Sequence, residues 1–153
     1  MTTQISQPHL RAWGLLLATQ TALVAAVEDA LAQADLPPLA WYDVLWPLAE
    51  ARRPLRMGEL SAGVVTIGRT GLTRLVDRLA AAGMLARTPS ATDRRGVEVA
   101  ITAEGKRLLK RMWPVYAAAV DEHFAAVLDE AEAVQLTELL ERIVMRSPSS
   151  AIA

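Results

Sequence analysis

Apolar residues recur every three or four positions along most of this chain, which is the spacing typical of amphipathic helices. This pattern predicts helices over residues 8–34, 39–51, 57–62, 69–82, from 103 onward and from 130 onward. The period changes near residue 85, where Val97, Val99 and Ile101 alternate with other residues. The segments LARTP and GVEVAIT are therefore predicted to be the two strands of a hairpin, the one convincing β segment. The predicted fold class is mainly α with a small β-hairpin.

Residues that start and stop helices support these boundaries. Gly83 supplies a left-handed stop after the fourth helix, and Thr102 is placed to cap the next one. Asp129 and Glu132 form a capping-box pattern for the last helix. Pro47 and Pro114 fall inside helical patterns, where proline removes a backbone donor. We therefore predict a kink or a shortened helix at Pro47 and a bend at Pro114.

The first helix is long for a chain of 153 residues. Residues 8–34 would extend about 39 Å, more than one small domain covers. Its apolar stretch, Ala12–Val27, has Thr19, Gln20 and Thr21 at its centre and is shorter than the ~20 apolar residues of a spanning helix. We predict that protein buries this helix, with no membrane partner.

The composition excludes several kinds of chemistry. The chain has no cysteine and two histidines, which rules out disulfides, thiol catalysis and cysteine-based zinc sites. His9 and His123 lie in separate predicted helices without metal-ligand spacing, and we expect His123 to be a partly buried helix residue. There is no glycine-rich phosphate loop. We expect no metal, no cofactor and no catalytic residues, hence no enzyme, and the absence of a secretory signal pattern favours the cytoplasm.

Positive charge is concentrated in the middle of the chain. The net charge is -1, but residues 52–111 hold 13 Lys or Arg against 5 Asp or Glu, and the two flanks hold 3 against 12. Such asymmetry indicates a surface that faces a polyanion, with a solvated basic face as the alternative.

The helix over 69–82 and the hairpin after it suit double-stranded DNA. One face of the helix is aliphatic, and Arg69, Thr70, Thr73 and Arg74 project from another face near its N-terminus, as a helix in the major groove requires. Arg94 and Arg95 stand at the hairpin tip, from which arginines reach a minor groove. Asp93 is expected to restrain an arginine or the turn. The alternative is that the two tip arginines pair with Glu98 or Glu104.

The segment GLTRLVDRLAAAGMLARTPSATDRRGVEVAITAEGKRLL, residues 71–109, resembles the core of the MarR family of winged helix-turn-helix transcriptional regulators. Recognition helix, DRR wing and the T.EG helix start match in register. The resemblance implies that the recognition helix and the wing contact DNA, here through Thr70, Thr73, Arg74, Arg94 and Arg95, to which we add Arg69 for its expected exposure.

The resemblance also implies a homodimer that reads a pseudo-palindromic operator with half-sites about 34–36 Å apart. Residues 1–36 and 102–153 would form the dimerisation region, and residues 37–101 the DNA-binding lobe. Both terminal segments are apolar around more of their circumference than one small domain buries. We expect a repressor relieved by a small ligand.

In this family the small-molecule pocket lies between the dimerisation helices and the DNA-binding lobe. Trp13, Trp41, Trp46 and Trp113, with Arg11, are the candidates here, and they suit a small aromatic or anionic ligand. Aromatic residues at helical spacing are more often core, which is our preferred interpretation for most of them. The competing function is a winged-helix protein-interaction module without DNA binding, against which Arg94 and Arg95 argue.

Overall fold

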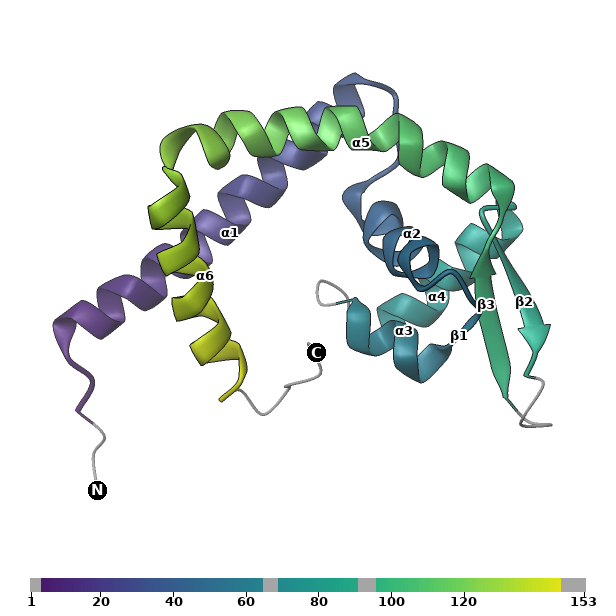
Figure 1. Ribbon diagram of the computed structural model, residues 1–153, viewed down its shortest axis with the longest axis horizontal. Helices are drawn as coiled ribbons and strands as arrows, with labels where there is room; N and C mark the ends of the chain where they lie inside the picture. Colours follow the sequence, from purple (N-terminus) through teal and green to yellow (C-terminus); the bar gives the residue numbers. More distant parts are fainter. Residues whose placement is uncertain (1–3, 65–68, 91–95, 147–153) are drawn as a thin grey trace.

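The computed structural model describes residues 4–64, 69–90 and 96–146, without the side chains of residues 69 and 70. In this part of the chain, helices flank a small antiparallel sheet (Figure 1). The elements are α1 (Gln7–Gln33), α2 (Leu39–Ala51), β1 (Leu55–Arg56), α3 (Met57–Gly63), α4 (Arg69–Ala81), β2 (Leu85–Pro89), β3 (Val97–Ile101), α5 (Ala103–His123), the 3₁₀ turn η1 (Ala125–Val127) and α6 (Glu130–Val144). The predicted class, mainly helical with a β-hairpin wing, is confirmed.

Most of the hydrophobic core lies in a winged lobe, which we define as α2 to β3 together with the N-terminal half of α5, and Val27 and Leu31 of α1 join the same core. Helix α2 lies at the centre of this lobe and contacts α3, α4, α5 and β3. Leu45, Val76 and Val99 are completely buried, and they come from α2, α4 and β3 respectively. Side chains from α2, α4 and β3 therefore share one core, as apolar burial requires in a small domain.

The sheet has one strand more than the sequence pattern predicts. Strand β3 lies in the middle, with β1 and β2 antiparallel on either side. Leu55 of β1 pairs with Val99, and Leu85 of β2 pairs with Ile101. Strand β1 has two residues, which is too few to show an alternating pattern, so the sequence did not predict it. This strand connects the start of α3 to the sheet.

Three residues join α4, β2 and α5 at the base of the hairpin. Gly83 has a φ of 76°, the left-handed conformation predicted for a helix stop. The Thr102 hydroxyl donates to the Gly83 carbonyl (2.7 Å) and accepts from the Gly105 backbone N–H (3.1 Å), which confirms the cap. A Cβ atom at Gly105 would lie 2.2 Å from the Met84 carbonyl oxygen, so only glycine fits there. The T.EG motif is thus a close-packed joint.

Both internal prolines lie within continuous helices. Helix α2 keeps its predicted length through Pro47, so the predicted shortening is wrong, and α5 continues through Pro114. The helix predicted from residue 103 onward stops at His123, and the 3₁₀ turn η1 follows it. His123 and Val127 are both exposed, so the expected partial burial of His123 is not found.

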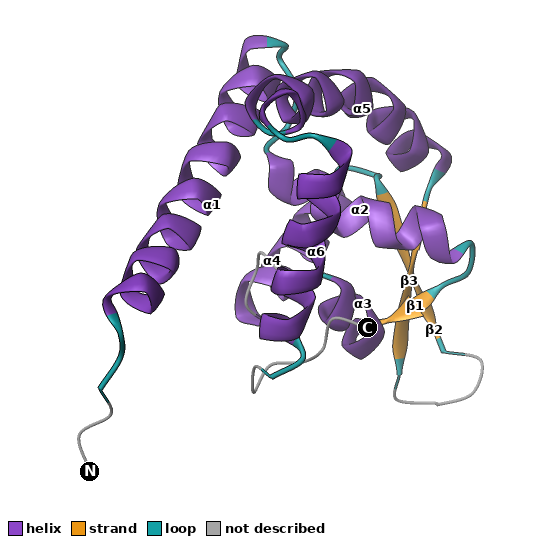
Figure 2. Cartoon of the chain, turned by 60° about the vertical axis from the view of Figure 1, so that its left-hand side comes forward, coloured by secondary structure: helices purple, strands orange, loops and turns teal. Residues whose placement is uncertain are grey.

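The two ends of the chain form exposed arms, which we define as residues 7–22 of α1 and helix α6. The second half of α1 packs against α5, where Val27 and Leu31 are buried. All residues from 7 to 22 are exposed, and α6 contains no buried residue. Figure 2 shows α1 extending away from the rest of the chain. The capping box at Asp129 and Glu132 is confirmed, with bonds of 2.8 and 3.0 Å.

Candidate nucleic-acid interface and aromatic groove

Helix α4 presents two unlike faces, as predicted. Leu72, Leu75, Val76 and Leu79 are buried in the lobe, which leaves the opposite face to solvent. Thr73 and Arg74 lie on this exposed face. Arg69 and Thr70 are the first two residues of α4, and their side chains lie outside the described part of the structure. The helix therefore has the amphipathic form that a groove-binding helix needs.

An ion pair connects α4 to the hairpin. The Arg87 Nη2 atom lies 2.6 Å from the Asp77 Oδ1 atom, so β2 and α4 are linked across their shared surface. Both side chains are partly exposed, at 38% and 56%, so the pair contributes little to stability. The pair lies between α4 and β2, so it links the exposed face of the helix to the hairpin. The sequence pattern does not predict this pair, because the pair depends on how β2 lies against α4.

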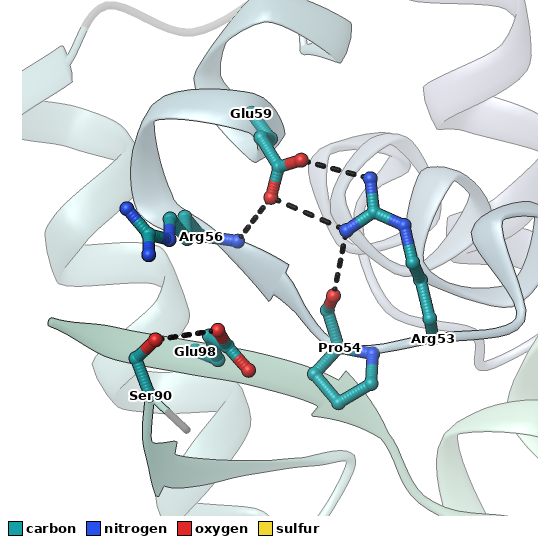
Figure 3. A network of polar contacts seen from close by, with 6 residues as sticks. All are labelled: Arg53, Pro54, Arg56, Glu59, Ser90 and Glu98. Carbon is teal, nitrogen blue, oxygen red and sulfur yellow. Dashed lines mark hydrogen bonds and ion pairs between the residues drawn. The ribbon is translucent and has the colours of Figure 1, made fainter. Parts of the chain in front are cut away.

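A second polar network holds the start of α3, the helix before α4 (Figure 3). The Arg53 guanidinium donates to both carboxylate oxygens of Glu59, at 2.8 and 3.4 Å, and to the Pro54 carbonyl at 3.0 Å. The same carboxylate accepts from the Arg56 backbone N–H at 2.7 Å. These bonds favour the ionised form and lower the pKa of Glu59 to about 2.

Arg94 and Arg95, predicted at the tip of the hairpin, lie outside the described residues, and so does Asp93. The two carboxylates considered as alternative partners both have described contacts. The Ser90 hydroxyl donates to Glu98 at 2.8 Å (Figure 3), and Glu104 forms an ion pair with Arg107. The strands themselves extend to the side of the lobe away from α5 (Figure 1).

An aromatic groove lies between α2 and α5. Tyr42 and Trp46 of α2 and Trp113 and Tyr116 of α5 line a hollow of about 490 Å³, together with Asp43. The rings stack in sequence, with centroid separations of 5.8 Å for Tyr42–Trp46, 4.9 Å for Tyr42–Tyr116, 6.3 Å for Trp46–Trp113 and 5.9 Å for Trp113–Tyr116. Such pairs lie within the range of favourable aromatic contact.

Both tyrosines of this groove have raised pKa values. Burial raises the pKa of Tyr42, with smaller contributions from Tyr116 and Asp43. Burial and then the Asp43 charge raise the pKa of Tyr116 as well. Both phenols therefore stay neutral at physiological pH. Among the described residues lining the groove, Asp43 carries a charge and none is cationic.

Only some of the predicted pocket residues come together. Trp46 and Trp113 line the groove side by side, joined by two tyrosines that the prediction did not include. Trp41 is partly buried against the lobe core. Trp13 and Arg11 lie on the exposed arm of α1, and no contact brings them to the groove within the described chain. Helical spacing shows which residues share a face, but not which neighbouring helix that face meets.

Comparisons with known proteins agree with this geometry. The sequence profile of the MarR family matches residues 34–96. HTH-type transcriptional regulator MhqR from Bacillus subtilis (strain 168) is 37% identical over 79 residues, which cover 52% of this chain and 54% of MhqR, so the match spans about half of that relative.

Two solved structures extend the likeness beyond the matched region. Sco3205, a MarR family regulator from Streptomyces coelicolor in complex with DNA, has a TM-score of 0.84 at 27% identity, covering 94% of this chain and 89% of Sco3205. BpsR from Bordetella bronchiseptica, whose DNA binding is regulated by 6-hydroxynicotinic acid, has a TM-score of 0.73 at 23% identity, covering 87% and 98%.

A two-faced helix joined to a β-hairpin defines the winged helix-turn-helix class of DNA-binding proteins. Within this class, the family profile, MhqR and Sco3205 all indicate MarR-type transcriptional regulators. Residues 34–96 match the MarR family profile, and the fold over most of the chain is that of the MarR family transcriptional regulator Sco3205.

Proposed function

We propose that this protein is a cytoplasmic, dimeric repressor that binds a pseudo-palindromic operator and releases it when a small ligand binds. The observation that carries the proposal is the α4–wing unit, in which Thr73 and Arg74 are exposed and the Asp77–Arg87 pair fixes helix to hairpin. DNA contacts are assigned to Arg69, Thr70, Thr73, Arg74, Arg94 and Arg95, and the turn at the wing tip to Asp93.

The exposed arms support the dimer. Leu10, Trp13, Leu15, Leu16 and Leu17 of α1 and Val134, Leu139 and Ile143 of α6 are exposed hydrophobic residues. Exposed apolar stripes of this length mark an interface. We assign residues 1–36 and 102–153 to dimerisation and 37–101 to DNA binding.

A membrane is the other apolar surface that α1 fits. The stretch of residues 12–27 was expected to be too short to span a bilayer, but the complete helix of 27 residues is long and apolar enough by length and composition alone, a test that core helices of soluble proteins and signal sequences also pass. Similarity to a family of DNA-binding regulators favours the second copy, because two lobes on one two-fold axis read two half-sites.

Electrostatic attraction supplies much of the expected affinity. Arginines that neutralise phosphates release counterions, so the logarithm of the binding constant falls linearly with the logarithm of salt concentration. We expect the wing arginines to bind DNA whatever its base sequence. Arg74, near the N-terminus of α4, is placed to contact base edges, which depend on the sequence.

The decisive experiment selects bound duplexes from a random pool and then measures affinity by fluorescence anisotropy at several salt concentrations. We expect an inverted repeat with half-sites about 34–36 Å apart. Arg94→Ala with Arg95→Ala should weaken binding to all DNA and reduce the salt slope by about two. Arg74→Ala should weaken the selected sequence more than random DNA. Arg146→Ala, outside the lobe, is the control. Unchanged binding by both test variants would contradict the assignment, and binding to no DNA would favour a protein-interaction module.

A further inference from the structure

A second hollow, which we call the basic hollow, lies where α2 ends, β3 ends and α5 begins. Its volume is about 410 Å³, and its lining residues are Leu48, Ala49, Arg52, Arg53, Pro54, Ala100, Ile101 and Lys106. It shares no lining residue with the aromatic groove. Ala100 and Ile101 stand at the end of β3 that leads into α5, so the basic hollow lies at the opposite end of this strand from the wing tip.

Positive charge is concentrated in the lining of the basic hollow. Arg52, Arg53 and Lys106 are cationic, and none of the described lining residues is acidic. Arg53 is partly neutralised by Glu59, whose carboxylate accepts from it at 2.8 and 3.4 Å (Figure 3). The side chains of Arg52 and Lys106 are exposed and form no hydrogen bond or ion pair with the residues that the structure describes.

The neighbouring acid on β3 does not offset these cations. Glu98 accepts from Ser90 at 2.8 Å and stands opposite Arg56 in the register of β1 and β3. The three cations of the lining therefore face one bonded carboxylate, that of Glu59, which leaves a local charge of about +2. Like charges held close together repel, so this arrangement favours a bound anion.

Two of the cations stand where the local backbone does not favour them. Arg52 ends α2 with a φ of 52°, the left-handed conformation that glycine adopts most easily. The dipole of α2 attracts a cation at this end, but glycine would form the turn without strain. Lys106 lies near the N-terminus of α5, where a positive charge opposes the helix dipole. Departures from local preference that meet at one hollow indicate a role in binding.

We propose that the basic hollow binds a small phosphate monoester, whose phosphate lies between Arg52 and Lys106 and whose organic part packs against Leu48 and Ile101. A phosphate monoester carries a charge of about −1.5 to −2 at neutral pH, which matches the local charge of the hollow. A guanidinium group binds two phosphate oxygens at once, and an ammonium group adds a compact charge. The apolar part of the lining and the volume suit a small organic molecule.

This inference goes beyond the proposed function, because the basic hollow contains none of the residues assigned to DNA and none from the aromatic groove. The test is made without DNA and uses butyl phosphate, butyl sulfate, butanol and inorganic phosphate. Each probe is titrated into the full chain at pH 8 and followed by calorimetry. Butyl sulfate has the shape of butyl phosphate with a single charge, and inorganic phosphate lacks the organic part.

We expect butyl phosphate to bind with a dissociation constant below about 1 mM. It should bind at least about fivefold more tightly than butyl sulfate and than inorganic phosphate, because each of these lacks one of the two interactions. Butanol should not bind measurably. This comparison uses the unmodified protein, so it does not depend on the folding of a variant.

Variants then assign the binding to the hollow. Arg52→Gly removes one cation and places glycine in the left-handed turn, so butyl phosphate affinity should fall about tenfold without a decrease in Tm. Lys106→Gln should also lower the affinity and leave the Tm unchanged or higher. Lys110→Gln, which changes an exposed lysine one turn further along α5, is the matched control and should change the affinity by less than about twofold.

Four results would overturn the proposal. They are no binding of butyl phosphate at about 1 mM, equal binding of butyl sulfate or inorganic phosphate, unchanged affinity in both test variants, and a lower Tm of Arg52→Gly, which would show that the arginine serves the turn itself. A duplex of random sequence is titrated into the same variants. Weaker DNA binding together with unchanged butyl phosphate binding would assign both cations to the nucleic-acid interface instead. Butyl phosphate binding in a protein that binds no DNA would contradict the regulator function alone.

Discussion

The winged lobe and the arms use the same types of residue in opposite ways. In the lobe, aliphatic side chains from α2, α4 and β3 meet and are fully buried. In the arms, leucine, valine and isoleucine recur at the same spacing but remain exposed. An amphipathic pattern therefore indicates that a face will be buried without showing by which molecule. The lobe completes its core within one chain, and we expect the arms to do so with a second copy.

The largest effect is expected from the glycine at the base of the wing. Gly105→Ala places a Cβ atom 2.2 Å from the Met84 carbonyl oxygen, so α5 and the α4–β2 turn must separate. We expect a loss of about 3 kcal/mol or more in the free energy of unfolding, measured by urea denaturation. Gly58→Ala in α3, with no atom within 4 Å of the added carbon, is the control and should change stability by less than about 1 kcal/mol. Equal stability of the two variants would show that the joint is not close-packed.

Charge on the arm should break the dimer and leave the lobe intact. Leu139→Asp with Ile143→Asp puts two carboxylates on the exposed apolar stripe of α6. We expect the dimer dissociation constant to rise by about 100-fold or more, roughly 2.7 kcal/mol, in analytical ultracentrifugation. Gln135→Asp, also on α6, serves as the charge control. A chain that stays dimeric in the double variant would place the interface elsewhere.

A smaller effect is expected where helix and wing are joined. Asp77→Asn removes the ion pair with Arg87, and because both groups are largely exposed the loss of stability should stay below about 1 kcal/mol. Operator affinity should nevertheless fall several-fold, because the angle between α4 and the wing is no longer fixed. Glu138→Gln, an exposed acid on α6, controls for the change in charge. Unchanged operator affinity in Asp77→Asn would show that packing alone sets this angle.

The smallest effect concerns acid pH. The folded-state pKa of Glu59 is about 2, below its ordinary value of 4.5, because of Arg53 and the Arg56 N–H. The folded state therefore gains stability from this group above about pH 4.5 and loses it as the pH falls toward 2. Glu59→Gln should flatten the slope of stability against pH in this window, because its small deficit in stability is fully present at pH 8 and disappears as the pH falls toward 2. An identical dependence of stability on pH in both proteins would show that the contacts of Glu59 with Arg53 and Arg56 do not stabilise the folded state.

Local signals in the sequence predicted much of the fold. Gly83, Thr102 and Asp129 marked helix ends because capping depends on a few neighbouring residues. Pro47 does not shorten α2, which was one of the two outcomes predicted for it, because Leu45 and Leu48 on either side hold the helix in the core.

In the candidate sites too, the sequence predicted features that depend on a single helix but not those that depend on how two elements pack. The exposed position of Arg74 follows from the stripe of its own helix, and the structure agrees. The ring partner of Trp46 on α5 depends on how α2 meets α5, so the sequence could show neither that Trp46 stacks on Trp113 nor that Trp13 lies away from both. The Asp77–Arg87 pair likewise depends on how β2 lies against α4.

Helix α5 is continuous from the base of the wing to the arms, with the groove residue Trp113 eight residues beyond Gly105. A helix rises about 1.5 Å per residue, so these two residues lie roughly 12 Å apart along the same helix. We expect a displacement of Trp113 to be passed along α5 to the contact of Gly105 with the Met84 carbonyl, because Gly105 has no room to move there. A small change in the tilt of α5 would then change the position of the wing relative to the two-fold axis that we propose.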